Sequence, residues 1–224
     1  MAASQDVRTH GLEPQHVLRA DQTCPTGRSK AVTASPLLLA RALGALDELG
    51  IPYAIGGSFA SSLWGRPRQT MDLDINVFLD LEQAQGLAEL LQGEFALSQG
   101  DMEDAIKGSA PFRSFQLLHI EEVFKIDAFV LDESPYTSEL LRRRRFHEVA
   151  PGVGAAFLSP EDIVLTKLRW YVLGNRVSDR QLNDVVQVLE AQWSEFDFDY
   201  AKTWCGHFGI AEELETAMSL VAQP

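Results

Sequence analysis

Residues 53–80 carry the sequence YAIGGSFASSLWGRPRQTMDLDINVFLD, and the interpretation of the whole chain starts from this stretch. A short apolar run leads into glycine, glycine and serine at residues 56–58, and a second apolar run holds Asp72 and Asp74. The pattern predicts a strand, a tight turn, a helix of small residues, a basic loop and a second strand. Two chemical features, one at the turn and one on the second strand, lie within this predicted unit.

The two aspartates of the second strand are spaced to share one face. Successive side chains of a strand alternate in direction, so Asp72 and Asp74 point to the same side, away from Leu73 and Ile75. Neighbouring carboxylates repel each other unless a cation lies between them. Mg²⁺, or Mn²⁺ in its place, prefers hard oxygen ligands and is commonly held by one or two carboxylates together with substrate phosphates. The pair therefore predicts a divalent metal site.

The glycine-serine turn is suited to binding an anion. Gly56 and Gly57 allow the backbone to approach a ligand closely, and the start of the following helix offers unpaired N–H groups. Ser58 adds a hydroxyl donor, and the next loop carries Arg66 and Arg68. A phosphate-binding turn followed by a metal-binding strand predicts the chemistry of a nucleoside triphosphate (NTP).

The pattern GGS-x13-D-x-D, with R-x-T-x-D-L-D as its second half, resembles the DNA polymerase β-like nucleotidyltransferase superfamily. Within it, the chain is most similar to the minimal and AbiEii-type toxin nucleotidyltransferases. The resemblance implies an α+β fold in which a mixed-sheet nucleotidyltransferase domain precedes a helical domain. It also implies that Arg68 and Thr70 lie at the nucleotide site. Asp127, in the sequence KIDAF, is then the third carboxylate that such proteins often carry on a later strand.

Residues 115–120 and 123–131 predict two strands of a hairpin, and the second contains Asp127. Alternation places Asp127 on the same face as Lys125 and Phe129. Two alternatives follow. Asp127 either converges with the two aspartates of the earlier strand or pairs with Lys125 on a solvent-exposed face.

Two later helices place a lysine and an aspartate among apolar residues. Ser159 is the expected N-cap of the first, and Ser178 with Gln181 is the expected capping box of the second. The resemblance to the AbiEii-type family implies that Lys167 contacts triphosphate oxygens and that Asp184 orients Lys167 or the acceptor. The alternative is an ion pair between Lys167 and Asp184 that only ties the two helices together.

The domain organisation follows from composition. Residues 1–35 have few large apolar side chains and predict a flexible tail. We expect the nucleotidyltransferase domain at 36–135, beginning with a helix from Pro36 to about Gly50, and a mainly helical domain at 136–224. Residues 100–108, rich in glycine and acidic residues, are expected to form a loop.

The charge pattern is uneven. The chain of 224 residues has a formal net charge of −13, which argues against a protein that simply coats nucleic acid. Acidic residues concentrate at 71–135, whereas 136–185 is comparatively basic and contains four consecutive arginines, Arg142 to Arg145. These arginines predict either a solvated helix end or a contact with a nucleotide or polynucleotide backbone.

The predicted reaction is transfer of a nucleoside monophosphate from an NTP to an acceptor hydroxyl or phosphate. The acceptor stays open among RNA or tRNA, a protein and a small molecule. A toxin of this class would have an antitoxin protein as its partner. The alternative function is a catalytically silent module that binds NTP or a partner protein. No signal peptide or run of 18 apolar residues is found, so a cytoplasmic location without membrane contact is expected.

Overall fold

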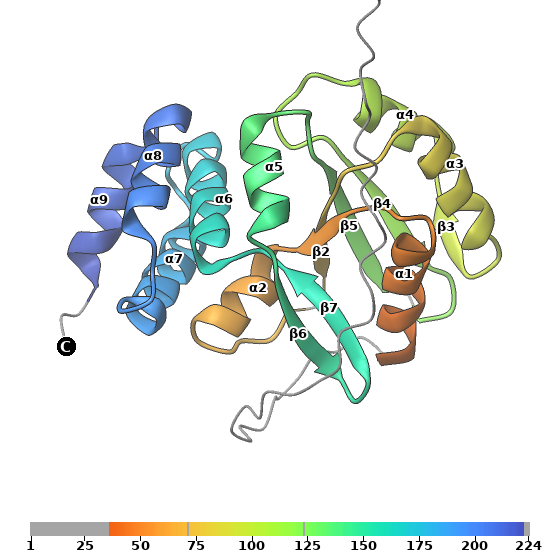
Figure 1. Ribbon diagram of the computed structural model, residues 1–224, viewed down its shortest axis with the longest axis horizontal. Helices are drawn as coiled ribbons and strands as arrows, with labels where there is room; N and C mark the ends of the chain where they lie inside the picture. The colour runs from red at the N-terminus through yellow and green to blue at the C-terminus, as the bar shows by residue number, and fades with distance from the viewer. Residues whose placement is uncertain (1–35, 71, 123, 222–224) are drawn as a thin grey trace, which may run out of the picture.

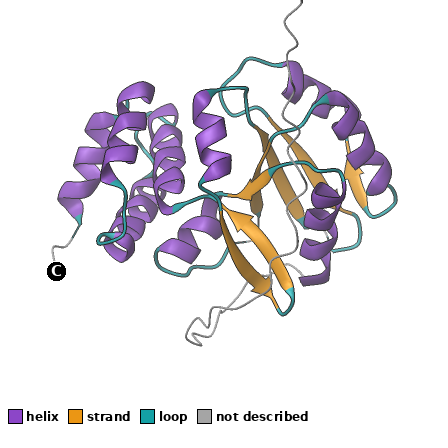
Figure 2. Cartoon of the chain, in the orientation of Figure 1, coloured by secondary structure: helices purple, strands orange, loops and turns teal. Residues whose placement is uncertain are grey.

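The computed structural model describes residues 36–70, 72–122 and 124–221, so the predicted tail at 1–35 lies outside the described residues. The described chain forms one mixed sheet flanked by helices, with a group of helices beside it (Figures 1 and 2). The helices are α1 (Pro36–Glu48), α2 (Gly57–Trp64), α3 (Leu81–Leu90), α4 (Gln99–Lys107), α5 (Pro135–Arg142), α6 (Pro160–Leu173), α7 (Asp179–Gln192), α8 (Phe198–Phe208) and α9 (Ala211–Leu220). The strands are β1 (Tyr53–Ile55), β2 (Leu73–Val77), β3 (Phe95–Leu97), β4 (Ser114–His119), β5 (Lys125–Val130), β6 (Arg145–Ala150) and β7 (Val153–Phe157).

The sheet has the strand order β3-β4-β5-β2-β1-β7-β6. Strand β2 is central, antiparallel to β1 and parallel to β5. The predicted hairpin of β4 and β5 is antiparallel, as expected. The mixed sheet followed by helices confirms the predicted α+β fold class.

Strand β2 separates an apolar face from a polar one, as its alternation predicts. Leu73 and Ile75 are buried in the core, whereas Asp74 is half-buried on the other face. Helix α3 follows at Asp80, whose carboxylate accepts the N–H of Gln83, while the Gln83 side chain bonds back to the Asp80 N–H. This capping box fixes where the chain leaves the sheet.

The last four helices pack together beside the sheet (Figure 2). Helix α6 contacts α7 and α8, and α9 contacts α7 and α8. Ser159 and Ser178 cap α6 and α7, as the sequence predicts. Buried Leu168 and Val185 lie in the common apolar core. Helices α8 and α9 complete this group.

The expected loop at 100–108 is wrong, because most of it belongs to α4. The Ser98 hydroxyl accepts the N–H of Asp101 at the start of the helix, and Met102 and Ala105 bury one side of it. Capping and burial of this apolar pair outweigh the low helix propensity of Gly100.

The four-arginine run bridges the end of α5 and the start of β6. Arg142 pairs with an exposed glutamate of its own helix. Arg143 lies 3.1 Å from buried Glu161, and Arg144 donates to the Tyr53 carbonyl at 2.8 Å. Three of the four side chains therefore have partners within the protein, which favours a structural role over contact with a polynucleotide.

The boundary expected at residue 135 stays a prediction. Strands β6 and β7 follow it in sequence, yet β7 pairs in parallel with β1 through Ile55 and Phe157. Residues 145–157 therefore belong to the sheet. No helix in the described ranges is long and apolar enough to cross a membrane.

Candidate active site

The turn between β1 and α2 is packed directly against the acidic strand. Gly57 has φ +53°, and a Cβ added there would lie 1.7 Å from Oδ2 of Asp74. The Gly56 N–H donates to the Asp74 carbonyl at 2.8 Å, and the Ser58 N–H bonds to the Asp74 carboxylate. Only glycine meets both the positive φ and the close approach at position 57. The turn predicted to bind phosphate and the predicted metal ligand therefore form one unit.

Asp127 lies directly beside Asp74, because the two are register partners in the parallel pair of β2 and β5. Of the two alternatives left open by the sequence, the one in which Asp127 lies on the same face as Asp74 is therefore present. Burial and the negative charges of Asp127 and Asp72 raise the pKa of Asp74 to about 6, although Lys167 and the Ser58 N–H act in the opposite direction. The acidic face thus carries more negative charge than the protein neutralises.

The alternative reading of Asp127 also holds in part. Lys125 Nζ lies 2.7 Å from Asp127 Oδ2, and Gln116 donates to Oδ1 at 3.0 Å. Asp127 is therefore both a neighbour of Asp74 and the partner of Lys125. A role as a metal ligand would require that Lys125 release one carboxylate oxygen.

A preformed metal cage is absent from the part of the chain that the structure describes, where no group of three or more His, Cys, Asp or Glu is arranged to hold an ion. Mg²⁺ does not require one, since substrate phosphates and water complete its shell. Burial and the charges of Asp127 and Asp72 raise the pKa of Asp74 although Lys167 acts in the opposite direction, so a further cation beside it would favour the charged carboxylate. Asp72, Asp74 and Asp127 therefore suit a hard divalent cation that arrives with a triphosphate.

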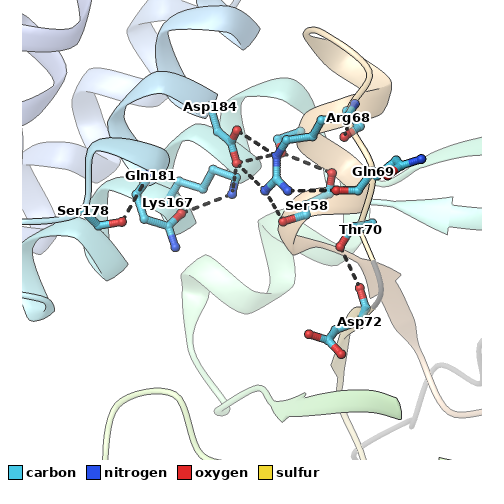
Figure 3. A network of polar contacts seen from close by, with 11 residues as sticks. Ser58, Arg68, Gln69, Thr70, Asp72, Lys167, Ser178, Gln181 and Asp184 are labelled. Carbon is cyan, nitrogen blue, oxygen red and sulfur yellow. Dashed lines mark hydrogen bonds and ion pairs between the residues drawn. The ribbon is translucent and has the colours of Figure 1, made fainter. Parts of the chain in front are cut away.

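A cationic network closes the other side of the site (Figure 3). Asp184 lies 2.7 Å from Lys167 and 3.0 Å from Arg68, and all three side chains are mostly buried. Arg68 also donates to the Ser58 hydroxyl. Asp184 thereby fixes two cations beside the glycine-serine turn. The predicted proximity of Lys167 and Asp184 is confirmed.

Burial and pairing act in opposite directions on this network. Burial lowers the pKa of Lys167, and the nearby carboxylate of Asp184 offsets this only in part. Burial disfavours the ionised form of Asp184, but the hydrogen bond from Arg68 and the charge of Lys167 outweigh it and lower the pKa of Asp184. Both Arg68 and Lys167 thus hold the aspartate in its charged form.

Thr70 lies on the same loop as Arg68, and its hydroxyl donates to the Asp72 carbonyl at 3.3 Å. Arg66 pairs instead with Glu190 on α7 at 3.0 Å. The structure therefore brings Arg68, but not Arg66, to the glycine-serine turn. Of the two basic residues of the loop, only Arg68 is placed to meet a phosphate.

A pocket of about 240 Å³ lies between the acidic face and the helices, lined by Gly57, Ser58, Asp74, Asn76, Phe112, Phe129, Ile163, Thr166, Lys167, Trp170 and Gln181. Residues from the sheet and from α6 and α7 thus face the same space. Polar groups converge in it beside aromatic ones, which is typical of a small-molecule site.

Gln181, Phe112 and Trp170 are among the residues of this pocket that sequence reasoning missed as site residues. The Gln181 side chain was expected to complete a capping box, but it accepts a hydrogen bond from Lys167 at 3.2 Å, while Ser178 caps the helix alone. Phe112 and Trp170 stack with ring centroids 4.1 Å apart. Trp170 carried a signal, as an apolar neighbour of Lys167 on the helix. Phe112 carried none, since it lies in a loop with φ +58°.

No family model and no curated protein matches the chain. Solved structures do. ANT(2″)-Ia, solved in complex with adenylyl-2″-tobramycin, aligns over 77% of this chain and 95% of its own, with a TM-score of 0.50 and 16% identity. The lincosamide antibiotic adenylyltransferase LnuA, in its lincomycin-bound form, covers 69% of this chain and 96% of its own, with a TM-score of 0.45 and 13% identity.

A third structure comes from Thermotoga maritima and is described as a nucleotidyltransferase. It covers 62% of this chain and 86% of its own, with a TM-score of 0.46 and 19% identity. At such low identities the likeness concerns the fold. The chain has the nucleotidyltransferase fold, in agreement with the resemblance to the DNA polymerase β-like superfamily.

Proposed function

We propose that the protein is a nucleotidyltransferase that moves a nucleoside monophosphate from an NTP to an acceptor hydroxyl or phosphate and releases pyrophosphate. The observation that carries this proposal is the packing of the Gly57–Ser58 turn against Asp74, which is paired in register with Asp127. A triphosphate cradle and an acidic face are thereby joined in one site. The nucleotidyltransferase fold of the chain supports the same reaction class.

In this proposal the triphosphate lies between the turn and the cationic network. The N-terminus of α2, with Gly56, Gly57 and Ser58, binds the β- and γ-phosphates. Lys167 and Arg68 neutralise their charge, and Asp184 holds both cations in place. Thr70 supports the loop that carries Arg68. The charges of Lys167 and Arg68 interact more strongly with the phosphates here than they would on an exposed surface, because the site is largely buried.

Asp72, Asp74 and Asp127 are the proposed ligands of Mg²⁺ or Mn²⁺. The bound cation supplies charge stabilisation at the reacting phosphate. An acceptor oxygen attacks the α-phosphorus, the bond to the bridging oxygen of the β-phosphate breaks, and pyrophosphate carries away the electron pair. Asp127 lies beside Asp74 and is the candidate to take the acceptor proton. It can do so once Lys125 has released the Asp127 carboxylate.

We infer that the acceptor is a small molecule rather than RNA, tRNA or a protein. Three of the four consecutive arginines that were candidates for contact with a polynucleotide, Arg142 to Arg144, have partners within the protein. ANT(2″)-Ia, which shares the fold, was solved with adenylyl-2″-tobramycin, an adenylylated small molecule. The AbiEii-type assignment, the toxin role with its antitoxin partner and the cytoplasmic location remain proposals that rest on the sequence resemblance and composition.

The second candidate function is a catalytically silent module that binds NTP. The ion pair between Lys125 and Asp127 favours this candidate, because Lys125 occupies the third carboxylate of the proposed metal site. One experiment separates the two. Purified protein is incubated with Mg²⁺, each of the four α-labelled NTPs, and either total RNA, protein or a small-molecule extract. The Asp72→Ala/Asp74→Ala variant serves as the inactive control, and Asp104→Ala, at an exposed position of α4, as the matched one.

Label that moves to an acceptor with wild type and Asp104→Ala, but not with the double variant, supports the transferase. Metal-dependent NTP binding without any transfer contradicts it and supports the silent module. The fraction in which the label appears identifies the acceptor class.

A further inference from the structure

A second and larger cavity continues from the pocket described above. Its volume is about 720 Å³, within the usual range for small-molecule sites. The two cavities share Asn76, Phe112, Phe129 and Thr166 as walls. Asn76 and Phe129 follow the Asp74–Asp127 pair by two residues along β2 and β5, which is about 7 Å of strand. A molecule in the larger cavity can therefore extend a group to the acidic face.

Arg169, on α6, lines this larger cavity, where Asp132 and Tyr136 act on its guanidinium through their charge but form no hydrogen bond or ion pair with it among the described residues. Its guanidinium lies 4.2 Å from the ring centroid of Phe208 and 4.9 Å from that of Phe112. Among the described residues it makes these ring contacts and no hydrogen bond or ion pair. Two aromatic rings thus hold the guanidinium while its N–H groups remain available to a ligand.

The second arginine on the walls of this cavity differs from Arg169 in its hydrogen-bond partners. Arg113 also lines it, but donates to the backbone carbonyls of Ile106, Gly108 and Leu131. An arginine satisfied by carbonyls has a structural role. Arg169 has the opposite arrangement, with a fixed position and unused donors, as expected of a residue that binds an incoming anion.

The charge of the cavity walls contrasts with that of the protein. The cavity walls carry two arginines, Arg113 and Arg169, and a single carboxylate, Asp132, so the cationic side chains outnumber the anionic one. Asp132 accepts hydrogen bonds from Ser134 and Thr137 and is thereby engaged. The chain as a whole has a net charge of −13. A cavity with two arginines and one engaged carboxylate on its walls, in so acidic a protein, disfavours a cationic ligand.

Aromatic rings form much of the remaining wall, contributed by Phe112, Phe129, Tyr136, Trp204 and Phe208. Tyr136 stands edge-on to Phe208 at 4.9 Å and lies 5.0 Å from Trp204. Such walls bind a flat ring through burial and ring-edge contacts. A planar group and an anionic group are therefore the two features that the cavity complements.

We propose that this cavity is the acceptor site and that the acceptor is a small ring-containing molecule with a carboxylate or phosphate group, which Arg169 binds. The inference rests on the proposed transferase function, since it names the class of molecule that accepts the nucleotide. The anion is bound at Arg169, the ring lies among the aromatic walls, and the reacting oxygen points past Asn76 and Phe129 toward Asp74.

The test uses three probes that share one ring and one hydroxyl group and differ only in charge. They are 4-(hydroxymethyl)benzoate, 4-(hydroxymethyl)benzamide and 4-(hydroxymethyl)benzylamine. Binding to the full chain is measured by ligand-observed NMR. We expect the benzoate to bind at least about tenfold more tightly than the benzylamine, in line with a charge-assisted hydrogen bond. Arg169→Gln should remove this preference, Arg169→Lys should keep part of it, and Arg180→Gln, at an exposed position of α7, should leave it unchanged.

Equal binding of the three probes, or a preference for the benzylamine, would overturn the inference. If Arg169→Gln does not fold, the order of the three probes on the wild-type protein still decides. A second arm separates a small-molecule extract into anionic, neutral and cationic fractions and offers each to the enzyme with α-labelled NTP. Label is expected in the anionic fraction and should depend on Arg169, and label confined to another fraction contradicts the inference.

Mg²⁺-dependent NTP binding, measured on the same samples, keeps the two proposals apart. If the NTP binds and is transferred but the benzoate has no advantage, the acceptor inference fails and the transferase stands. A second outcome is that no fraction accepts label while binding of the benzoate still depends on Arg169. In that case the proposed transfer function fails and the acceptor role fails with it, and the cavity is an anion-binding site only.

Discussion

The carboxylate of Asp74 occupies the space into which any side chain at Gly57 would extend. A Cβ at position 57 would lie 1.7 Å from Oδ2, 2.5 Å from Cγ and 2.7 Å from Cβ of Asp74. Rotation of the aspartate cannot relieve the last of these contacts, because Cβ does not move with χ1. The turn and the acidic strand therefore constrain each other's sequence.

Gly57→Ala should cost at least about 2 kcal/mol of stability, since it combines a strained positive φ with overpacking. It should also abolish NTP binding, because the turn must move away from Asp74. Chemical denaturation and NTP titration check both effects. Gly206→Ala is the matched control. Its Cβ would meet no atom within 4 Å in α8, so a gain of about 0.5–1 kcal/mol is expected. Equal effects at the two glycines would contradict the prediction.

Asp74→Asn should stabilise the metal-free protein at neutral pH. The pKa of Asp74 is raised from 3.8 to about 6 in the folded state, so the folded protein retains a proton that the unfolded chain loses between these values. Wild-type stability therefore falls as pH rises through this window, by up to about 3 kcal/mol. Asparagine does not ionise and avoids this loss.

The measurement is the free energy of unfolding from pH 4 to pH 8 in the presence of a chelator. The advantage of Asp74→Asn over wild type should grow between pH 4 and pH 6 and then level off. Asp104→Asn, at an exposed carboxylate of α4, is the matched control. An advantage that is constant with pH would exclude the proposed charge effect.

Asp184→Asn should destabilise the protein by about 3 kcal/mol or more, because removal of one partner leaves Lys167 buried without its counter-charge. It should also weaken NTP binding, since Arg68 and Lys167 lose their common anchor. A double-mutant cycle with Lys167→Met measures the coupling. Additive effects of the two substitutions would show that the pair does not act as a unit.

Lys125→Met should increase the affinity for Mn²⁺, because Lys125 lies 2.7 Å from Asp127 Oδ2 and competes with a cation for that oxygen. Electron paramagnetic resonance of free Mn²⁺ gives the affinity directly. Lys107→Met is the matched control, since Lys107 pairs with Glu103 on exposed α4. An unchanged affinity for Mn²⁺ in Lys125→Met would mean that Asp127 does not bind the metal.

Local patterns predicted the parts of the site that depend on one segment. The alternation around Asp74 fixed its face, and the serine before Pro160 fixed the start of α6. The pairing of Lys167 with Asp184 followed from two polar residues on apolar helix faces. Contacts between distant segments were beyond local patterns. The role of Gln181 depends on the position of the Lys167 ammonium group, which donates to it. The stacking of Phe112 on Trp170 depends on a loop conformation that sequence periodicity does not predict. Helix α4 was missed because its capping and burial outweigh its composition.

The strand order has a consequence for how the chain acquires its site during synthesis. The central strand β2 pairs with β5, and β1 pairs with β7, which is made much later. Contacts between such distant segments form slowly, since long loops must close first. The cationic wall requires α6 and α7, which leave the ribosome after the acidic face. A nascent chain that ends before Asp184 carries the aspartates and the glycine turn but lacks the anchor of both cations. The proposed capacity to hold a triphosphate is thus gained only after α7 has been synthesised.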